Sequence, residues 1–269
     1  MSDNFPRGRF VWYDLMTSNP QEGQAFYKAL IPGWETEAWE GGGKPYTMWA
    51  NDGKPLGGTM ELPEEARAAG APPHWLAYIA TPDADATAAR AQELGGEVLS
   101  EPMDIPTVGR FAILADPQGA VFAAFTPATA APGHDGSPLL GEFSWHELIT
   151  TDHAAAFGFY TELFDWQKGE AMDMGPAGTY QMYGQINGLP ECPLGGMFNK
   201  TAEMPGPPAW LFYIRVENVQ NSAKRVEELG GKVLVGPMEV PGGDWVVHCM
   251  DPQGAAFALH HVTEPAVTS

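Results

Sequence analysis

Two short stretches of the chain carry a tryptophan and a carboxylic acid two residues apart. Trp12 precedes Asp14, and Trp145 precedes Glu147. Both stretches alternate like β-strands, and side chains two residues apart in a strand lie on one face of the sheet. A carboxylate that shares a cavity with an imidazole can transfer protons or bind a metal. Five of the seven histidines follow residue 140, so this chemistry is expected in the second half of the chain.

These stretches belong to a unit that occurs twice. The segment Pro-Pro-His-Trp-Leu-Ala-Tyr-Ile at 72–79 returns 135 residues later as Pro-Pro-Ala-Trp-Leu-Phe-Tyr-Ile at 207–214. The same offset relates two further motifs, namely Glu-Leu-Gly-Gly at 93–96 and 228–231, and Asp-Pro-Gln-Gly at 116–119 and 251–254. A constant offset across several elements indicates two copies of one folded unit. We therefore predict a first domain at 1–126, a linker rich in Pro, Gly and small residues at 127–138, and a second domain at 139–269.

Length and charge limit the classes of function. At roughly 150 residues per domain, the 269 residues correspond to about two domains, and each half is long enough for its own core. The formal net charge of −20 opposes binding to nucleic acid or to an anionic membrane, because both would repel the protein. No leader sequence and no membrane-spanning run is present, so we expect a cytoplasmic protein. Cys192 and Cys249 stand at non-equivalent places without metal-binding spacing, and we expect both to be reduced.

Helix signals are few and clear. A strand from Phe10 to Met16 is followed by a helix whose cap is Asn19, and Asp152 takes the same place in the second copy. Later helices are predicted at 83–94 and 218–229, each ending at a Gly-Gly pair that favours a left-handed cap. The remaining segments alternate like strands, with Asp-Pro-Gln-Gly as a hairpin turn. The fold class is therefore α+β.

The order of these motifs resembles the vicinal oxygen chelate superfamily, which includes glyoxalases, bleomycin-resistance proteins and extradiol dioxygenases. The resemblance rests on three features over nearly the whole chain: an Asp or Asn that opens a helix containing Phe-Tyr, the Glu-Leu-Gly-Gly ending, and Asp-Pro-Gln-Gly before a last strand. It implies tandem duplicated glyoxalase-like domains. Each domain would consist of two βαβββ modules that form a curved, open cup.

The resemblance also implies where the metal ligands of the family would fall. Counted from the helix caps and the turns, these places hold only apolar residues: Trp12, Trp145, Leu76, Leu211, Ala123 and Ala258. A divalent cation needs carboxylate, imidazole or thiolate donors, which these side chains lack. We therefore expect no cofactor, and a divalent metal at a displaced site stays an alternative.

Alternation along the strands predicts which side chains face each cup. The first cup would present Trp12, Asp14, Tyr78 and Phe125, and the second would present Trp145, Glu147, Tyr213 and His260, with His248 also in reach. Glu147 and His260 are the predicted catalytic residues, and the other side chains are predicted to bind substrate. Paired tryptophans at the former ligand places would suit a flat or conjugated organic ligand. A polar pair that only joins strands would explain Glu147 and His260 equally well.

Three functions fit these residues. The first is an enzyme that acts on a small organic molecule without the usual metal, as a lyase, isomerase or oxygenase. The second is a protein that binds or sequesters such a molecule, like the drug-resistance members, and the third is a metal-dependent dioxygenase or glyoxalase with a displaced site. The sequence leaves open whether one cup or both are functional, and whether the protein is a monomer or a homodimer.

Overall fold

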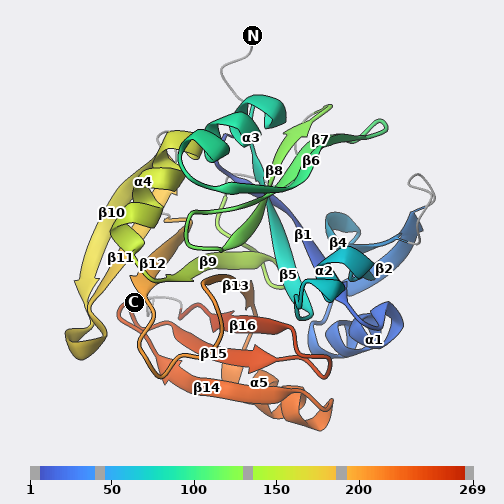
Figure 1. Ribbon diagram of the computed structural model, residues 1–269. Coiled ribbons are helices and arrows are strands. Elements are labelled where there is room, and N and C mark those ends of the chain that lie inside the picture. Colours follow the sequence, from blue (N-terminus) through green and yellow to red (C-terminus); the bar gives the residue numbers. More distant parts are fainter. Residues whose placement is uncertain (1–6, 40–45, 130–135, 186–192, 264–269) are drawn as a thin grey trace.

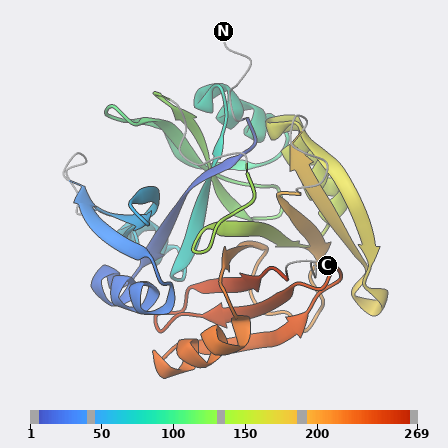
Figure 2. The same ribbon diagram turned by 180° about the vertical axis from the view of Figure 1, so that it is seen from behind.

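Two eight-stranded mixed sheets, one from each half of the chain, dominate the computed structural model (Figure 1). The structure describes residues 7–39, 46–129, 136–185 and 193–263. Both sheets are open rather than closed into barrels, and the few helices lie against them (Figures 1 and 2). The predicted α+β class and the duplicated architecture are confirmed.

Both sheets have the same strand order. The first contains, from edge to edge, β2 (Trp34–Trp39), β3 (Tyr46–Asn51), β4 (Lys54–Glu61), β1 (Phe10–Thr17), β5 (His74–Ala80), β8 (Val121–Pro127), β7 (Gly109–Ala115) and β6 (Glu97–Ile105). The second contains β10 (Trp166–Asp173), β11 (Thr179–Gln185), β12 (Gly195–Asn199), β9 (Phe143–Thr150), β13 (Ala209–Arg215), β16 (Ala256–His261), β15 (Trp245–Met250) and β14 (Lys232–Glu239).

Each sheet is built from two modules joined at their first strands. Strands β1 and β5 pair antiparallel at the centre of the first sheet, as β9 and β13 do in the second. Each of these first strands also pairs in parallel with the last strand of its own module. The four predicted βαβββ modules are therefore present.

The helices are α1 (Pro20–Leu30), α2 (Glu64–Ala68), α3 (Ala84–Glu93), α4 (His153–Phe164), the short 3-10 helix η1 (Gly175–Ala177) and α5 (Val219–Glu228). The four longer helices begin where the side chain of a capping residue accepts a hydrogen bond from the first turn: Asn19, Asp83, Asp152 and Asn218. Helices α3 and α5 are followed by Gly95 and Gly230, whose φ angles of +88° and +86° are left-handed as predicted.

One hydrophobic core is common to both halves. The ring of Tyr27 on α1 lies 5.2 Å from that of Phe257 on β16, and Phe122 on β8 lies 5.3 Å from Tyr160 on α4. The first helix of each half thus packs against the sheet of the other half. The two sheets are therefore not independent units with separate cores.

The halves are related by a local two-fold arrangement, because equivalent residues meet one another. The Tyr13 hydroxyl and His146 Nε2 lie 2.5 Å apart, and these two residues occupy matching places on β1 and β9. Phe10 stacks on His146 at 3.8 Å between ring centroids, and Phe143 stacks on Tyr13 at 3.7 Å. Burial lowers the pKa of His146 to about 4. His146 is therefore a residue between the halves, and it points away from Glu147 as alternation predicts.

The Asp-Pro-Gln-Gly turns also reach across the molecule. They connect β7 to β8 and β15 to β16, as predicted for hairpin turns. The side chain of Gln253 accepts a hydrogen bond from Asn19 N at 2.7 Å and donates one to Asn19 O at 2.9 Å. Gln118 likewise accepts from Thr151 N at 3.0 Å and donates to Asp152 O at 2.8 Å. Each turn therefore holds the start of the first helix in the other half.

The face of each sheet that carries Trp12 or Trp145 has its own apolar cluster, distinct from the shared core. In the first half this cluster includes Leu76, Tyr78, Ala123 and Phe125, with Trp12 packed against it; in the second it includes Leu211, Tyr213, Val246 and Ala258, with Trp145 packed against it. We call these faces the first cup and the second cup. Both tryptophans thus lie where the sequence predicts.

Three smaller predictions concern other parts of the chain. No helix in the described ranges is both long and apolar enough to cross a bilayer. Cys249 is a buried free thiol, whose pKa burial raises to about 12, whereas Cys192 lies outside the described residues. Residues 130–135 of the predicted linker also lie outside them, and the domain boundaries stay a prediction.

Candidate functional site

Asp14 in the first cup is a buried carboxyl group whose two oxygens both accept hydrogen bonds. Tyr46 and Trp12 donate to Oδ1 at 2.6 Å and 3.0 Å, and Tyr78 donates to Oδ2 at 2.8 Å. Burial raises the pKa of Asp14, while these donors oppose the rise. The hydrogen-bonding capacity of Asp14 is therefore taken up largely by protein groups.

Glu147 in the second cup has the same surroundings with one difference. Tyr180 donates to Oε2 at 2.9 Å and itself accepts a hydrogen bond from Trp145 Nε1 at 2.7 Å, as Tyr46 does from Trp12. Among the described residues, Oε1 has no hydrogen-bond partner although it is buried. Burial raises the pKa of Glu147 to about 7, against the opposing effect of the nearby tyrosine hydroxyls. Glu147 can therefore hold or release a proton near neutral pH.

The hydroxyl of Tyr213 distinguishes the second cup from the first. It lies near enough to Glu147 to lower the pKa of that carboxyl, but its close partner is His248 Nε2 at 2.7 Å. Burial lowers the pKa of His248 to about 4, so its imidazole is neutral at pH 7. In the first cup the matching tyrosine, Tyr78, donates to Asp14, and the place of His248 is taken by Ile113.

A glycine permits the tyrosine contact in each cup. Gly58 on β4 pairs with Asp14, and Gly196 on β12 pairs with Glu147. A Cβ at Gly58 would overlap the hydroxyl of Tyr46, and one at Gly196 would overlap the ring of Tyr180. The two tyrosines are site residues that the sequence did not predict. The Gly-Gly pairs at 57–58 and 195–196 were a signal for them, because the second glycine of each pair packs against the tyrosine.

His260 makes its hydrogen bonds with residues other than Glu147. Its Nδ1 is 2.9 Å from Ser144 Oγ, and its Nε2 is 3.1 Å from Asp244 Oδ2. Within the described part of the chain, Glu147 and His260 share no hydrogen-bond partner, so the structure does not join the predicted catalytic pair. At the place of His260, the first cup has Phe125, whose ring meets Tyr78 edge to face at 6.1 Å. A role in catalysis or binding for any of these side chains stays a prediction.

The side chains present do not suit the metal site of the family. Leu76, Leu211, Ala123 and Ala258 are buried apolar residues at the implied ligand places. In the ranges that the structure describes, no three His, Cys, Asp or Glu side chains come together as a metal site would require. A metal at these places would therefore need donors from other residues.

The outer wall of each cup exposes apolar side chains at matching places. Leu99 and Met103 on the edge strand β6 are 49% and 46% exposed, and Leu234 and Met238 on the edge strand β14 are 48% and 37% exposed. Met103 pairs with Phe111, which packs on the first-cup cluster, and Met238 pairs with Val246 of the second-cup cluster. Directly paired side chains lie on one face, so both methionines border the cups.

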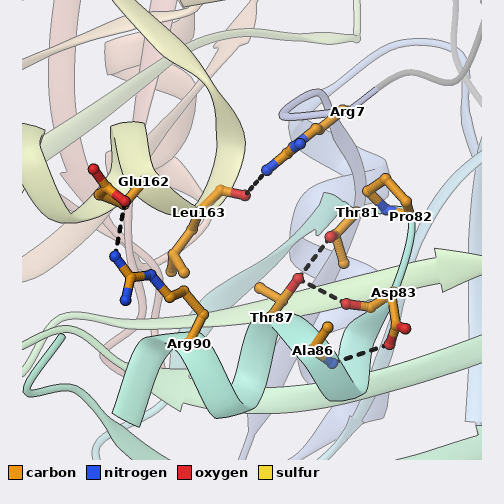
Figure 3. Close-up of a pocket in the computed structure, with 9 residues that line it drawn as sticks. All are labelled: Arg7, Thr81, Pro82, Asp83, Ala86, Thr87, Arg90, Glu162 and Leu163. Atoms are coloured by element: carbon orange, nitrogen blue, oxygen red, sulfur yellow. Dashed lines mark hydrogen bonds and ion pairs between the residues drawn. The ribbon is translucent and has the colours of Figure 1, made fainter. Parts of the chain in front are cut away.

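Two cavities lie away from this carboxyl network. One, of about 220 Å³, opens between α3 and α4 (Figure 3), but Arg90 on its wall already pairs with Glu162 at 2.9 Å, and Arg7 donates to Leu163 O at 3.2 Å. The other, of about 360 Å³, lies between α5 and β14. In the described part of the chain, neither cavity is lined by a buried side chain whose N or O atom lacks a hydrogen-bond partner, and the second cup is the better candidate site.

Comparisons with known proteins agree with the duplicated fold. The model of the glyoxalase/bleomycin resistance protein/dioxygenase superfamily matches residues 142–259, and a glyoxalase-like domain model matches residues 11–125. A Mycobacterium bovis protein, "Putative glyoxylase CFP32", is 43% identical over 121 residues, which are 45% of this chain and 45% of that protein. The anthracycline biosynthesis protein DauV of Streptomyces sp. (strain C5) is 29% identical over 270 residues, covering 97% of this chain and 95% of the relative.

A solved structure extends this likeness to the whole fold. The Mn(II)-bound glyoxalase from Novosphingobium aromaticivorans superposes with a TM-score of 0.63 at 16% identity, covering 96% of this chain and 82% of the other. Together with the two domain matches and the four βαβββ modules, this shows that the chain belongs to the glyoxalase/bleomycin resistance protein/dioxygenase superfamily and contains two domains of that kind.

Proposed function

We propose that the protein is an enzyme that transfers a proton within a flat, conjugated carbonyl compound bound in the second cup, with Glu147 as the general base and acid. One observation carries the proposal: Glu147 is buried, has a pKa of about 7, and keeps one oxygen without a partner among the described residues. A base works best when its pKa is near the operating pH, and strongly shifted pKa values are common at functional sites.

The chemistry needs only this carboxyl and the substrate. Ionised Glu147 takes a proton from a carbon next to the carbonyl group, and the electrons of the C–H bond move onto the carbonyl oxygen as an enolate. The protonated Glu147 then returns the proton to the same carbon or to another carbon of the conjugated system. Return of the same proton to another carbon is an isomerisation. If the proton on Glu147 is first replaced by one from solvent, the sum is hydrogen exchange, and neither changes the oxidation state.

The surroundings support a flat ligand. The indole of Trp145 packs on the second-cup cluster, and the exposed side chains of Val235 and Met238 pair with His248 and Val246 on the same face. Two relatives that align over 97% of this chain are named anthracycline biosynthesis proteins, and anthracyclines are flat compounds of fused, conjugated rings with carbonyl groups. A ligand of that type would cover apolar surface that otherwise faces water.

The test uses 2-tetralone, a bicyclic aromatic ketone with exchangeable C–H bonds beside its carbonyl group. In heavy water, the wild-type protein should accelerate loss of these protons, followed by proton NMR. Glu147→Gln removes the base and keeps the size of the side chain, so the rate should fall about 100-fold or more. Glu227→Gln makes the same change at an exposed place on α5, beside the second cavity and away from the carboxyl network, and should leave the rate unchanged.

Two results would count against an enzyme that uses Glu147 as its base. Exchange that persists in Glu147→Gln would assign the base elsewhere. Saturable quenching of tryptophan fluorescence by 2-tetralone, without any exchange, would instead support the binding or sequestering function.

A further inference from the structure

We propose that His248 is a positioning residue, which holds the hydroxyl of Tyr213 and thereby leaves Glu147 Oε1 open to a ligand. The inference rests on the proposed role of Glu147 and deepens it. It explains why the second cup would be reactive while the first cup, built on the same scaffold, would not.

The two cups provide an internal comparison. Tyr78 and Tyr213 occupy equivalent places on β5 and β13, 135 residues apart. The hydroxyl of Tyr78 donates to Asp14 at 2.8 Å. That of Tyr213 lies 2.7 Å from His248 Nε2, and Glu147 Oε1 has no partner within the described residues. Beside the tyrosine, the second cup has His248 in place of Ile113, and its acid is Glu147 in place of the shorter Asp14.

Hydrogen-bond counting explains how a single imidazole has this effect. A phenol hydroxyl has one proton to donate. When His248 is neutral with its proton on Nδ1, its Nε2 accepts that proton, and the hydroxyl cannot donate to Glu147 as well. An isoleucine offers no acceptor, which leaves the carboxyl as the partner of the hydroxyl in the first cup.

The groups around Glu147 are consistent with this account. The side chains that affect its pKa are the hydroxyls of Tyr180 and Tyr213, and no cation is among the causes of its shift. Burial is the cause of the shift of His248, which stays neutral over the range in which Glu147 titrates. A buried carboxyl oxygen without a donor is unfavourable, so a ligand that brings a hydroxyl group or an acidic C–H bond to this point would be favoured.

The test replaces His248 by the residue of the first cup. In His248→Ile, the hydroxyl of Tyr213 should turn to Glu147, and the midpoint of the Glu147 titration should fall by at least one pH unit. Carbon-13 NMR of protein labelled at the glutamate carboxyl measures that midpoint, and the signal that vanishes in Glu147→Gln identifies it. Exchange of 2-tetralone should slow about tenfold, because Oε1 is then occupied.

A second substitution separates positioning from a merely structural role. In His248→Ile with Tyr213→Phe, no hydroxyl is left to occupy Oε1, so the midpoint should return to the wild-type value or above. His248→Asn, which retains an acceptor, should change it less than His248→Ile does. If His248→Ile does not fold, His248→Val makes the same change with a smaller side chain: it offers no acceptor, so the midpoint of Glu147 must still fall.

An unchanged midpoint in folded His248→Ile, or in folded His248→Val, would overturn the inference. This readout needs no substrate. The inference can therefore fail while Glu147-dependent exchange persists, and the proposed enzyme can fail while the shifts in midpoint occur as expected.

Discussion

At the scale of single residues, ionisation of Glu147 lowers the stability of the folded protein. Its pKa rises from the ordinary 4.5 to about 7 in the folded protein, so between these values the native state keeps a proton that the unfolded chain gives up. Stability contributed by the neutral acid is therefore full below pH 4.5, falls as the pH rises, and is lost above 7. The whole loss corresponds to about 3 kcal/mol.

Glu147→Gln should remove this dependence. Between pH 5.5 and pH 8, the free energy of unfolding of the wild type should fall by about 2 kcal/mol more than that of the variant. Urea titrations at several pH values measure both. Other buried acids such as Asp14 and Asp116 titrate in both proteins, so the difference between the curves isolates Glu147. If the free energies of unfolding of the two proteins changed with pH in parallel, the pKa of Glu147 would not be raised in the folded protein.

Single residues also show how much of the site the sequence predicts. Alternation along a strand places Glu147 and Trp145 on one face, and the order of residues alone is enough to predict this. The partners of Glu147 depend on contacts between strands: Tyr180 reaches it because Gly196 leaves room for the ring. His260 lies on a predicted strand, but its partner Asp244 lies between β14 and β15, and alternation along one strand does not predict a contact with another segment.

At the scale of helices and strands, the elements with strong sequence patterns are the ones that the sequence predicts correctly. Helices with a capping side chain and an apolar face, such as α1 and α5, begin where the sequence predicts. Helix α2 was not predicted, because it has no side-chain cap and buries no residue. The edge strand β14 is mostly exposed and gives little alternation between buried and exposed positions. The hairpin turns were predicted, but the contact of their glutamines with the other half was not.

That contact should be a measurable part of the stability. Gln253→Ala removes the hydrogen bonds to the backbone of Asn19 and the contacts with the hydroxyls of Thr17 and Ser18. The free energy of unfolding should fall by about 1–3 kcal/mol, since buried backbone groups lose their partners. Gln118→Ala should have a similar effect, because Gln118 makes the equivalent contacts with the start of α4. Gln21→Ala, on the exposed face of α1, is the control. Equal stability of Gln253→Ala and this control would show that the turn does not hold the helix.

At the scale of the whole molecule, the two halves are bound together by exchanged contacts. Besides the crossed helices, Trp34 donates to Gly141 O at 2.7 Å, and Trp166 donates to Gly8 O at 2.8 Å. Each indole thus holds the backbone just before the first strand of the other half. Both cups are built on strands anchored in this way, so the geometry around Glu147 depends on the first half as well as on the second.

The chain should therefore unfold as one cooperative unit. Separation would expose the shared core, including Tyr27 and Phe122, whose partners lie in the other half. Urea unfolding followed by circular dichroism and by tryptophan fluorescence should give a single transition with one midpoint. Residues 1–127 expressed alone should lack the cooperative transition, because half of the core is missing. Two separate transitions in the full chain, or a cooperatively folded isolated half, would mean that each sheet is stable by itself and that the exchanged contacts contribute little.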